Sequence, residues 1–386
     1  MTTTAQLSDQ QQQALQQLLS VADRTDPLLD GLEVYIVGGA VRDALLNLAA
    51  GDRDWVVVGA LPEDLAQRGF IPVGGDFPVF LHPRTKEEFA LARTERKSGK
   101  GYKGFTFYTG VDVSLADDLK RRDLTVNALA YSLDGRLCDP LGGWADIQQR
   151  CLRHIGAAFS EDPVRLLRLA RFAARFHDFS IAAETLALAR DLVRLGEVDA
   201  LVPERVWQEF AKGLLTAAPG RMLQVLQDTE ALAHIAPSLL YTPALDSVLA
   251  WASKQNLPLS SRYALLCSQS PELDSIAKAL CSPREAKDMA RLLQLMLSSS
   301  AFSLGAGPEQ YLELFEQCDA LRRPDRFEQL LHAAQGLITL DEKTWMGRLE
   351  AIRQVDATAI VQKYKNQGQH IKAALRLARL QRLGSV

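Results

Sequence analysis

The feature that most constrains the fold is a change in hydrophobic pattern near residue 155 of the 386-residue chain. Before it, residues 32–140 alternate short runs of aliphatic residues with amphipathic segments, and glycine or proline separates many of them. After it, apolar residues recur at helical spacing as far as the C-terminus. The sequence therefore predicts an α/β or α+β head with a modest mixed sheet, followed by an all-helical remainder.

The predicted head is built from short elements. Strands are expected in "LEVYIVGG", "DWVVVGA", "PVFLHP" and "EEFALAR", and helices in "AVRDALLNL" and "LPEDLAQRGF", where proline lies near the first turn. A chain of this length is expected to form roughly two to four domains, since a single hydrophobic core stops growing well below it.

Composition excludes several classes of protein. The net charge is −3, so a nucleic-acid partner would need local basic patches. No apolar stretch approaches the roughly 20 residues of a membrane span, and the polar start does not resemble a signal peptide. The five cysteines are scattered without a C-x-x-C pair, which argues against disulfides and structural zinc. We therefore expect a cytoplasmic protein with no membrane contact.

Two motifs lie close together near the N-terminus. Gly38 and Gly39 end a predicted strand and open a helix, where free backbone N–H groups favour a phosphate and Arg42 could reach the same anion. Asp52 and Asp54 in "DRDWVVVG" project from one face of a strand, roughly 7 Å apart at the backbone. A tight turn and solvated or arginine-paired aspartates remain the alternatives. Together the motifs favour a triphosphate site beside a divalent cation site.

The pairing of "GGAVRDALL" with "DRDWVVVG" resembles the nucleotidyltransferase superfamily, specifically its class II branch of CCA-adding enzymes and bacterial poly(A) polymerases. This resemblance implies a polymerase-β-like head with a small mixed sheet, followed by an all-α neck, body and tail. The implied domains are a helical extension at 1–30, the head at 31–139, the neck at 140–215, and the body and tail at 216–386.

The resemblance also implies site residues in the head. Asp52 and Asp54 would be catalytic and would hold Mg²⁺, with Glu88 as a possible third acid, and Gly39 and Arg42 would bind nucleotide. In "DDLKRRDLTVNALA", residues 117–130, a charged surface helix is the alternative to a ligand-binding segment. The residues implied here to contact the sugar and triphosphate are Arg122, Asp123 and Asn127.

Residues 161–175, "EDPVRLLRLARFAAR", combine an acidic helix start with a ridge of arginines, which could also be a solvated stripe. In the resembling family this segment reads the nucleobase, which implies Asp162 and Arg165, with Arg168 and Arg171 near the base and phosphates. An aspartate accepts from the exocyclic amine that cytosine and adenine share.

The C-terminal half departs from the long bacterial CCA enzymes. Where their HD metal motif is expected, this chain has Ser268 and Gln269 after Cys267, so we predict that HD phosphohydrolase activity is absent; the dipeptide at 177–178 lacks the partners of such a site. Residues 203–210 are expected to brace the neck. The glycine- and lysine-rich segment at 93–105 matches a flexible element that the family uses for switching to AMP.

The predicted function is therefore a CCA tRNA nucleotidyltransferase that uses CTP and ATP and releases pyrophosphate. Basic clusters at 319–330 and 363–382 are expected to contact tRNA phosphates in the acceptor stem and top half. The alternatives are a poly(A) polymerase, a CC-adding enzyme and a catalytically inactive tRNA-binding protein.

Overall fold

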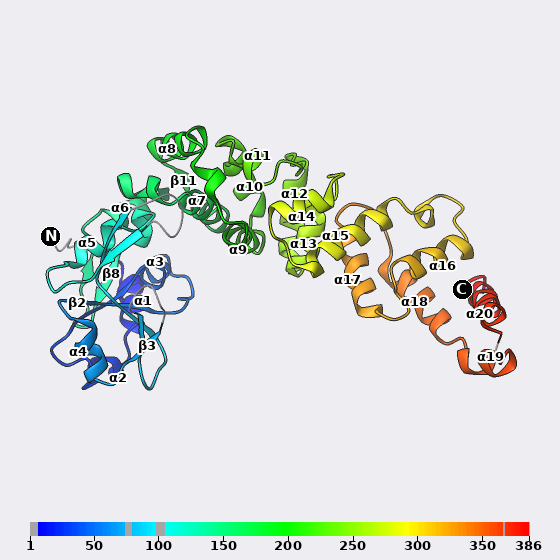
Figure 1. Cartoon of the computed structure of the whole chain (residues 1–386), viewed down its shortest axis with the longest axis horizontal. Coiled ribbons are helices and arrows are strands. Elements are labelled where there is room, and N and C mark those ends of the chain that lie inside the picture. The colour runs from blue at the N-terminus through cyan, green and yellow to red at the C-terminus, as the bar shows by residue number, and fades with distance from the viewer. Residues whose placement is uncertain (1–6, 74–78, 98–104, 366, 386) are drawn as a thin grey trace. The chain divides into compact units, whose positions relative to one another are not determined.

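The structure is a computed structural model that describes residues 7–73, 79–97, 105–365 and 367–385. It divides into two compact units. The first comprises Met1–Val202 and Val225–Ala231, and the second Pro203–Gln224 and Leu232–Val386. In Figure 1 the labelled strands belong to the N-terminal part of the chain, coloured blue to green, whereas the yellow to red part is helical. The predicted α+β head followed by helices is confirmed.

A seven-stranded mixed sheet forms the centre of the first unit, in the order β3-β4-β5-β2-β1-β8-β9. Only the β2–β5 pair is parallel. The strands are β1 (Glu33–Val37), β2 (Asp54–Val58), β3 (Ile71–Val73), β4 (Val79–Leu81), β5 (Glu88–Leu91), β8 (Ala130–Ser132) and β9 (Leu137–Cys138). A separate hairpin joins β6 (Thr94–Lys97) to β7 (Phe105–Tyr108). Residues 98–104 of the predicted flexible element lie outside the described residues.

The sheet is stable because both of its faces carry apolar side chains. Val37 and Val56 are buried on one face. On the other face Val57 is fully buried, and Trp55 stacks on Phe89 of the neighbouring strand with 5.1 Å between ring centroids. Such stacking across paired strands adds to the energy of burial. The register of β2 against β5 is thereby fixed, since a slip by one residue would turn these rings to the other face.

The helices of the first unit begin with α1 (Asp9–Gln17) and α2 (Val21–Arg24), which start at the serine capping boxes of Ser8 and Ser20. The others are α3 (Gly39–Leu45), α4 (Pro62–Gln67), α5 (Leu115–Lys120), α6 (Gly143–Gln148), α7 (Val164–Arg175) and α8 (Ala183–Arg194), with short 3₁₀ turns η1 (Thr125–Asn127), η2 (Ala157–Glu161) and η3 (Glu197–Ala200).

One local prediction was wrong, and the structure also excludes the helical alternative for one motif. The segment after residue 155 is not purely helical, because β11 (Ser180–Ile181) pairs in parallel with β10 (Cys151–Leu152). The charged segment at 117–130 is not one helix either. Helix α5 ends at Lys120, and the chain then extends, so that Ile155 N donates to Asp123 O at 3.1 Å and Thr125 N to Arg153 O at 2.9 Å. These pairings to residues 153–155, which follow β10, replace the hydrogen bonds of a continued helix.

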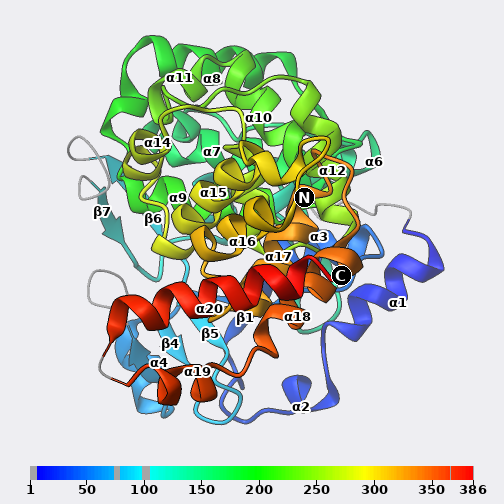
Figure 2. The same cartoon turned by 90° about the vertical axis from the view of Figure 1, so that its right-hand side faces the viewer.

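Within its described residues the second unit is helical. It contains α9 (Pro203–Leu214), the first part of α10 (Pro219–Asp228), most of α11 (Ala231–Ile235), α12 (Ala244–Lys254), α13 (Leu259–Leu266), α14 (Leu273–Ala279), α15 (Arg284–Leu297), η4 (Ser300–Phe302), α16 (Pro308–Gln317), α17 (Pro324–Ala334), α18 (Glu342–Arg353), α19 (Ala357–Lys363) and α20 (Gly368–Leu383). Helix α20, red in Figure 2, packs against α16 and α18. Among the described helices, none combines the length and apolar character needed to cross a membrane.

Candidate active site

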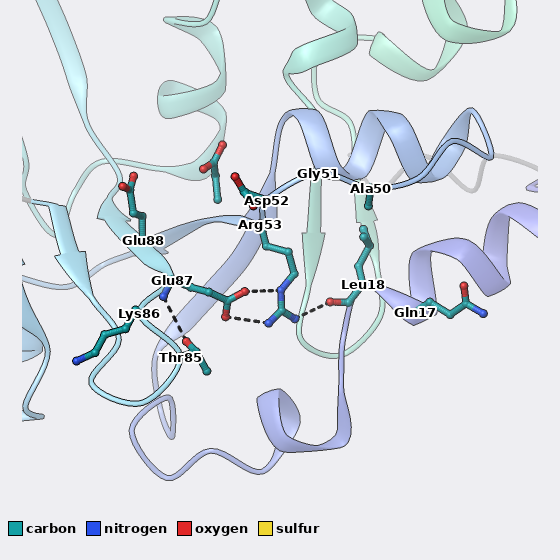
Figure 3. A pocket seen from close by; sticks show the side chains of 11 residues that line it. Gln17, Leu18, Ala50, Gly51, Asp52, Arg53, Thr85, Lys86, Glu87 and Glu88 are labelled. Carbon is teal, nitrogen blue, oxygen red and sulfur yellow. Dashed lines mark hydrogen bonds and ion pairs between the residues drawn. The ribbon is translucent and has the colours of Figure 1, made fainter. Parts of the chain in front are cut away.

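The adjacent ends of β2 and β5 carry three carboxylates. Because Trp55 pairs with Phe89 in parallel register, Asp54 and Glu88 occupy neighbouring positions on the opposite face from those rings. Asp52 lies two residues before Asp54, just outside the strand. Figure 3 shows the carboxylates of Asp52 and Glu88 pointing to the same side of the strands. The local alternation of a strand therefore gathers these acids as the sequence predicted.

Arg53, between the two aspartates, points away from them. Its guanidinium forms a bidentate pair with Glu87, at 2.6 and 2.8 Å, on the other side of the same strands (Figure 3). It also donates to Asp23 at 2.6 Å. The sequence alone leaves open whether Arg53 neutralises Asp52 and Asp54; in the structure its guanidinium is bonded to Glu87 and Asp23 instead.

A pocket of about 700 Å³ opens at these carboxylates, and residues 50–54 and 85–88 line most of it. Partial burial raises the pKa of Asp54; the nearby Glu88 and Asp52 also raise it, and Arg122 lowers it. Negative charge from the three carboxylates therefore exceeds the positive charge from Arg122, and a bound cation would balance it. In the described part of the chain, no three His, Cys, Asp or Glu side chains form a ready metal cluster. Two aspartates nevertheless fit Mg²⁺, which typically binds one or two carboxylates and completes its shell with substrate phosphates and water.

The glycine turn lies beside this pocket. Gly38 adopts φ 73° and ψ −123°, a conformation that strongly favours glycine, and Gly39 begins α3. Gly38 N donates to Leu129 O at 2.9 Å, so β8 holds the turn next to the segment that contains Arg122. A Cβ on Gly38 would lie only 2.9 Å from Nη1 of Arg122. The turn and a guanidinium that interacts with Asp54 are thus in direct contact.

Asp118 orients the arginines of this segment. It is fully buried and accepts from Arg121 at 2.7 Å and from Arg122 at 3.2 Å. Burial alone would raise the pKa of Asp118, but the two guanidinium groups hold it below its usual value. The sequence analysis did not select Asp118. Its spacing of three and four residues from the arginines could have indicated the interaction.

Three further predicted residues form an internal network. Asp123 and Asn127 are 5% and 6% exposed, and Asn127 donates to Asp123 at 3.0 Å while it accepts from Arg42. Arg168 of α7 donates to Asp123 at 2.6 Å. Although burial would raise the pKa of Asp123, Arg168 and the hydrogen bonds from Asn127 and the Leu124 amide lower it to about 2.

Arg42 is also internal, with only 2% of its surface exposed. It forms an ion pair with Asp43 at 2.8 Å, and its guanidinium lies 5.2 Å from the ring centre of Phe172 and 4.9 Å from that of Phe176. Asp43 in turn accepts from Arg175 of α7 at 2.7 Å. The structure therefore places Arg42 between α3 and α7, with its donors engaged by protein oxygens, and it gives the neighbouring Asp43 a role that the sequence analysis missed.

The remaining predicted residues lie at the start and along the face of α7. Asp162 precedes the helix and accepts from the Val164 amide at 3.0 Å. Arg165 is 9% exposed and donates to the carbonyl of Arg121 at 2.6 Å. Arg171 lies 4.2 Å from the centre of the Phe172 ring. Helix α7 is thus bonded directly to the segment that carries Arg122.

This fold and site define a nucleotidyltransferase. Residues 34–153 match the family described as Poly A polymerase head domain, and residues 178–241 match the probable RNA and SrmB-binding site of polymerase A. Nucleotidyltransferases of this kind generally use divalent metal ions.

Similar proteins identify the branch. The chain is 60% identical to the CCA-adding enzyme of Bordetella bronchiseptica, over 93% of this chain and 98% of the relative. It is 46% identical to the multifunctional CCA protein of Leptothrix cholodnii, over 92% and 96% of the two chains. The crystal structure of the Bacillus stearothermophilus CCA-adding enzyme in complex with CTP is 25% identical, with a TM-score of 0.68 over 97% of this chain and 92% of that chain. The chain therefore belongs to the family of CCA-adding enzymes.

Proposed function

We propose that the protein adds C, C and A in turn to the 3′ end of tRNA, using CTP and ATP without a nucleic-acid template and releasing pyrophosphate. The observation that carries the proposal is the contact between the glycine turn and Arg122 beside Asp52 and Asp54, in a chain 60% identical to a CCA-adding enzyme. This arrangement provides a seat for a triphosphate next to carboxylates that suit a metal.

Asp52 and Asp54 would hold Mg²⁺ at the reacting phosphate. When bound, Mg²⁺ would favour ionisation of the tRNA 3′ hydroxyl and stabilise the charge on departing pyrophosphate. Arg122 and the backbone N–H groups at Gly39 would bind the triphosphate, because charge-assisted hydrogen bonds position phosphates strongly. The carboxylates and the cationic turn would thus place the α-phosphate for attack.

Nucleobase selection is assigned to the start of α7. Asp162 and Arg165 would present an acceptor and donors to the edge of cytosine or adenine, with Arg168 and Arg171 near the base and phosphates. Arg42, Asp123 and Asn127 would support the nucleotide site from within, since their polar groups are occupied by one another and by other protein groups. Helix α7 would therefore combine recognition with support of the head.

We assign tRNA binding to the helical body and tail. We propose an extension at 1–30, a head at 31–139, a neck at 140–215 braced by residues 203–210, and a body and tail at 216–386 that bind tRNA phosphates. In the second unit, Arg284, Arg323 and Arg326 support this, because they line a pocket of about 500 Å³ and outnumber its two acidic residues, Glu285 and Asp288. A cytoplasmic location is part of the same proposal.

HD phosphohydrolase activity is proposed to be absent. At the position of the metal motif, Ser268 has a buried hydroxyl and Gln269 interacts with Thr242 at 3.4 Å. Neither side chain is a good ligand for a catalytic divalent metal, which is generally held by histidine or carboxylate groups. Metal-dependent release of phosphate or hydrolysis of a cyclic phosphodiester by the purified protein would contradict this assignment.

The test is an extension assay with tRNA that ends before CCA and each labelled nucleotide. Three discrete additions from CTP and ATP are expected. Asp52→Asn and Asp54→Asn should abolish incorporation while they preserve the unfolding transition, and Asp64→Asn, in the capping box of α4, serves as a control for loss of a carboxylate. A long ladder with ATP alone would instead indicate a poly(A) polymerase, two additions a CC-adding enzyme, and no addition a binding protein.

A further inference from the structure

The guanidinium of Arg53 is fully engaged behind the acidic site. Its five N–H groups match five hydrogen bonds: Nε and Nη2 donate to Glu87, Nη1 donates to Asp23 and to the carbonyl of Leu18, and Nη2 also reaches Asp23 at 3.4 Å. The guanidinium lies 5.0 Å from the ring centre of Trp55. A planar group bonded on every edge is held in one orientation, which a lysine could not reproduce.

These bonds connect three separate parts of the chain. Arg53 lies between Asp52 and Asp54, and Glu87 directly precedes Glu88, so the bidentate pair joins the two backbone segments that carry Asp52, Asp54 and Glu88. On the other side of the strands from these carboxylates, the same guanidinium bonds to Leu18, which follows α1, and to Asp23 of α2; Figure 3 shows the bond to Leu18. One side chain therefore links both acidic strand ends to the N-terminal extension.

The extension offers a rigid partner. Asp23 is 9% exposed, and its carboxylate also accepts from the Ser20 amide at 2.7 Å within the capping box of α2. The extension is attached elsewhere as well: Arg68 donates to the carbonyls of Leu28 and Asp30 at 3.0 and 2.8 Å. The position of Asp23 is therefore held by its own segment as well as by Arg53.

We infer that Arg53 is a positioning residue for the metal-binding carboxylates, and that the N-terminal extension, through Asp23 and the Leu18 carbonyl, is part of the device that fixes them. The inference rests on the proposed roles of Asp52 and Asp54. Three nearby carboxylates repel one another when no cation is bound, so a mobile loop would let them separate. By tying the two strand ends together from behind, Arg53 keeps the acids close enough to share a metal.

The experiment measures binding of Mn²⁺ alone to the full chain by electron paramagnetic resonance, together with kcat for CMP addition as a function of metal concentration. Arg53→Lys keeps the charge but loses the bidentate geometry, and it should weaken Mn²⁺ binding about tenfold, as the loss of outer partners of metal ligands commonly does. Asp23→Asn should shift binding in the same direction by a smaller factor. Arg68→Met is the matched control, because it loosens the extension away from the acids.

The outcomes separate positioning from simple stabilisation. The inference predicts that Arg53→Lys and Asp23→Asn raise the metal concentration for half-maximal activity, whereas Arg68→Met lowers only the melting temperature. If both site variants bind Mn²⁺ like the wild type while Asp52→Asn does not, the inference is overturned and the proposed function stands. If Asp52→Asn itself leaves Mn²⁺ binding and CMP addition unchanged, the metal assignment is wrong and the inference falls with it. Should Arg53→Lys fail to fold, Asp23→Asn decides.

Discussion

Gly38→Ala tests the glycine turn most directly. Gly38 has φ 73° and ψ −123°, and an added Cβ would lie 2.9 Å from Nη1 of Arg122. The methyl group therefore has two effects: it forces an alanine into a conformation that L-residues disfavour, and it displaces the guanidinium that we assign to the triphosphate. Gly59→Ala separates them, because Gly59 also has a positive φ, of 70°, but nothing within 4 Å of its Cβ position.

The two effects have different magnitudes and different readouts. A disfavoured backbone conformation costs on the order of 1–3 kcal/mol, which should appear as a lower free energy of unfolding for Gly38→Ala and as a smaller or similar loss for Gly59→Ala. Loss of a hydrogen bond to a charged group costs about 1.5–3 kcal/mol, or about 10- to 100-fold in affinity. Only Gly38→Ala should therefore weaken CTP binding.

The assays are urea denaturation and calorimetric titration of CTP in the presence of Mg²⁺ without tRNA, which prevents turnover. The expected result is a higher Kd for CTP in Gly38→Ala and an unchanged Kd in Gly59→Ala. The reasoning is refuted if Gly38→Ala binds CTP like the wild type, or if Gly59→Ala weakens binding equally. In the first case Arg122 is not a ligand of the triphosphate, and in the second the loss reflects stability alone.

Three other predictions follow from the buried groups. Asp123→Asn should lower the free energy of unfolding at pH 7 by about 2 kcal/mol, because the pKa of Asp123 is lowered from 3.8 to about 2 in the fold. Because the pKa of Asp123 is lower in the folded than in the unfolded protein, its ionised carboxylate stabilises the fold above the unfolded pKa, and this stabilisation is lost as pH falls through 2. Urea titrations of the wild type and the variant at neutral and acidic pH measure the change in unfolding free energy. Arg42→Met should cost about 3 kcal/mol, measured in the same way, because it removes one partner of a buried ion pair and two cation–π contacts. Cys267, whose pKa burial raises to about 12, should remain unalkylated in the folded protein while the exposed Cys281 reacts, as peptide mass spectrometry would show.

The parts of the site that follow local rules were predictable from the sequence. Strand alternation was sufficient to place Asp52 and Asp54 on one side, and the glycine pair was sufficient to predict the turn before α3. Glu88 required one further assumption, that β2 and β5 lie side by side, which the structure confirms. The same alternation also turns Arg53 away from the aspartates, a consequence that the sequence analysis did not use.

The rest depended on contacts between distant segments. Nothing near Arg42 in the sequence indicates that Phe172 and Phe176 cover its guanidinium. The assignment of Arg42 to nucleotide binding stays a prediction. The charged segment after α5 has residues that also suit a helix, and only its pairing with residues 153–155 shows that it is extended. In this segment tertiary structure overrides a local pattern.

The ion pairs between α7 and the head limit which segments can be exchanged between related enzymes. Asp43 is shared by Arg42 and Arg175, and Asp123 is held by Arg168, so the head contains buried charges that are balanced from another segment. A chimera joined between the head and α7 would leave a buried carboxylate uncompensated unless the donor supplied arginines at both positions. Chimeras that transfer the head together with α7 should fold. Chimeras that join the head of one enzyme to α7 of another should fold only if both carboxylate–arginine pairs are kept.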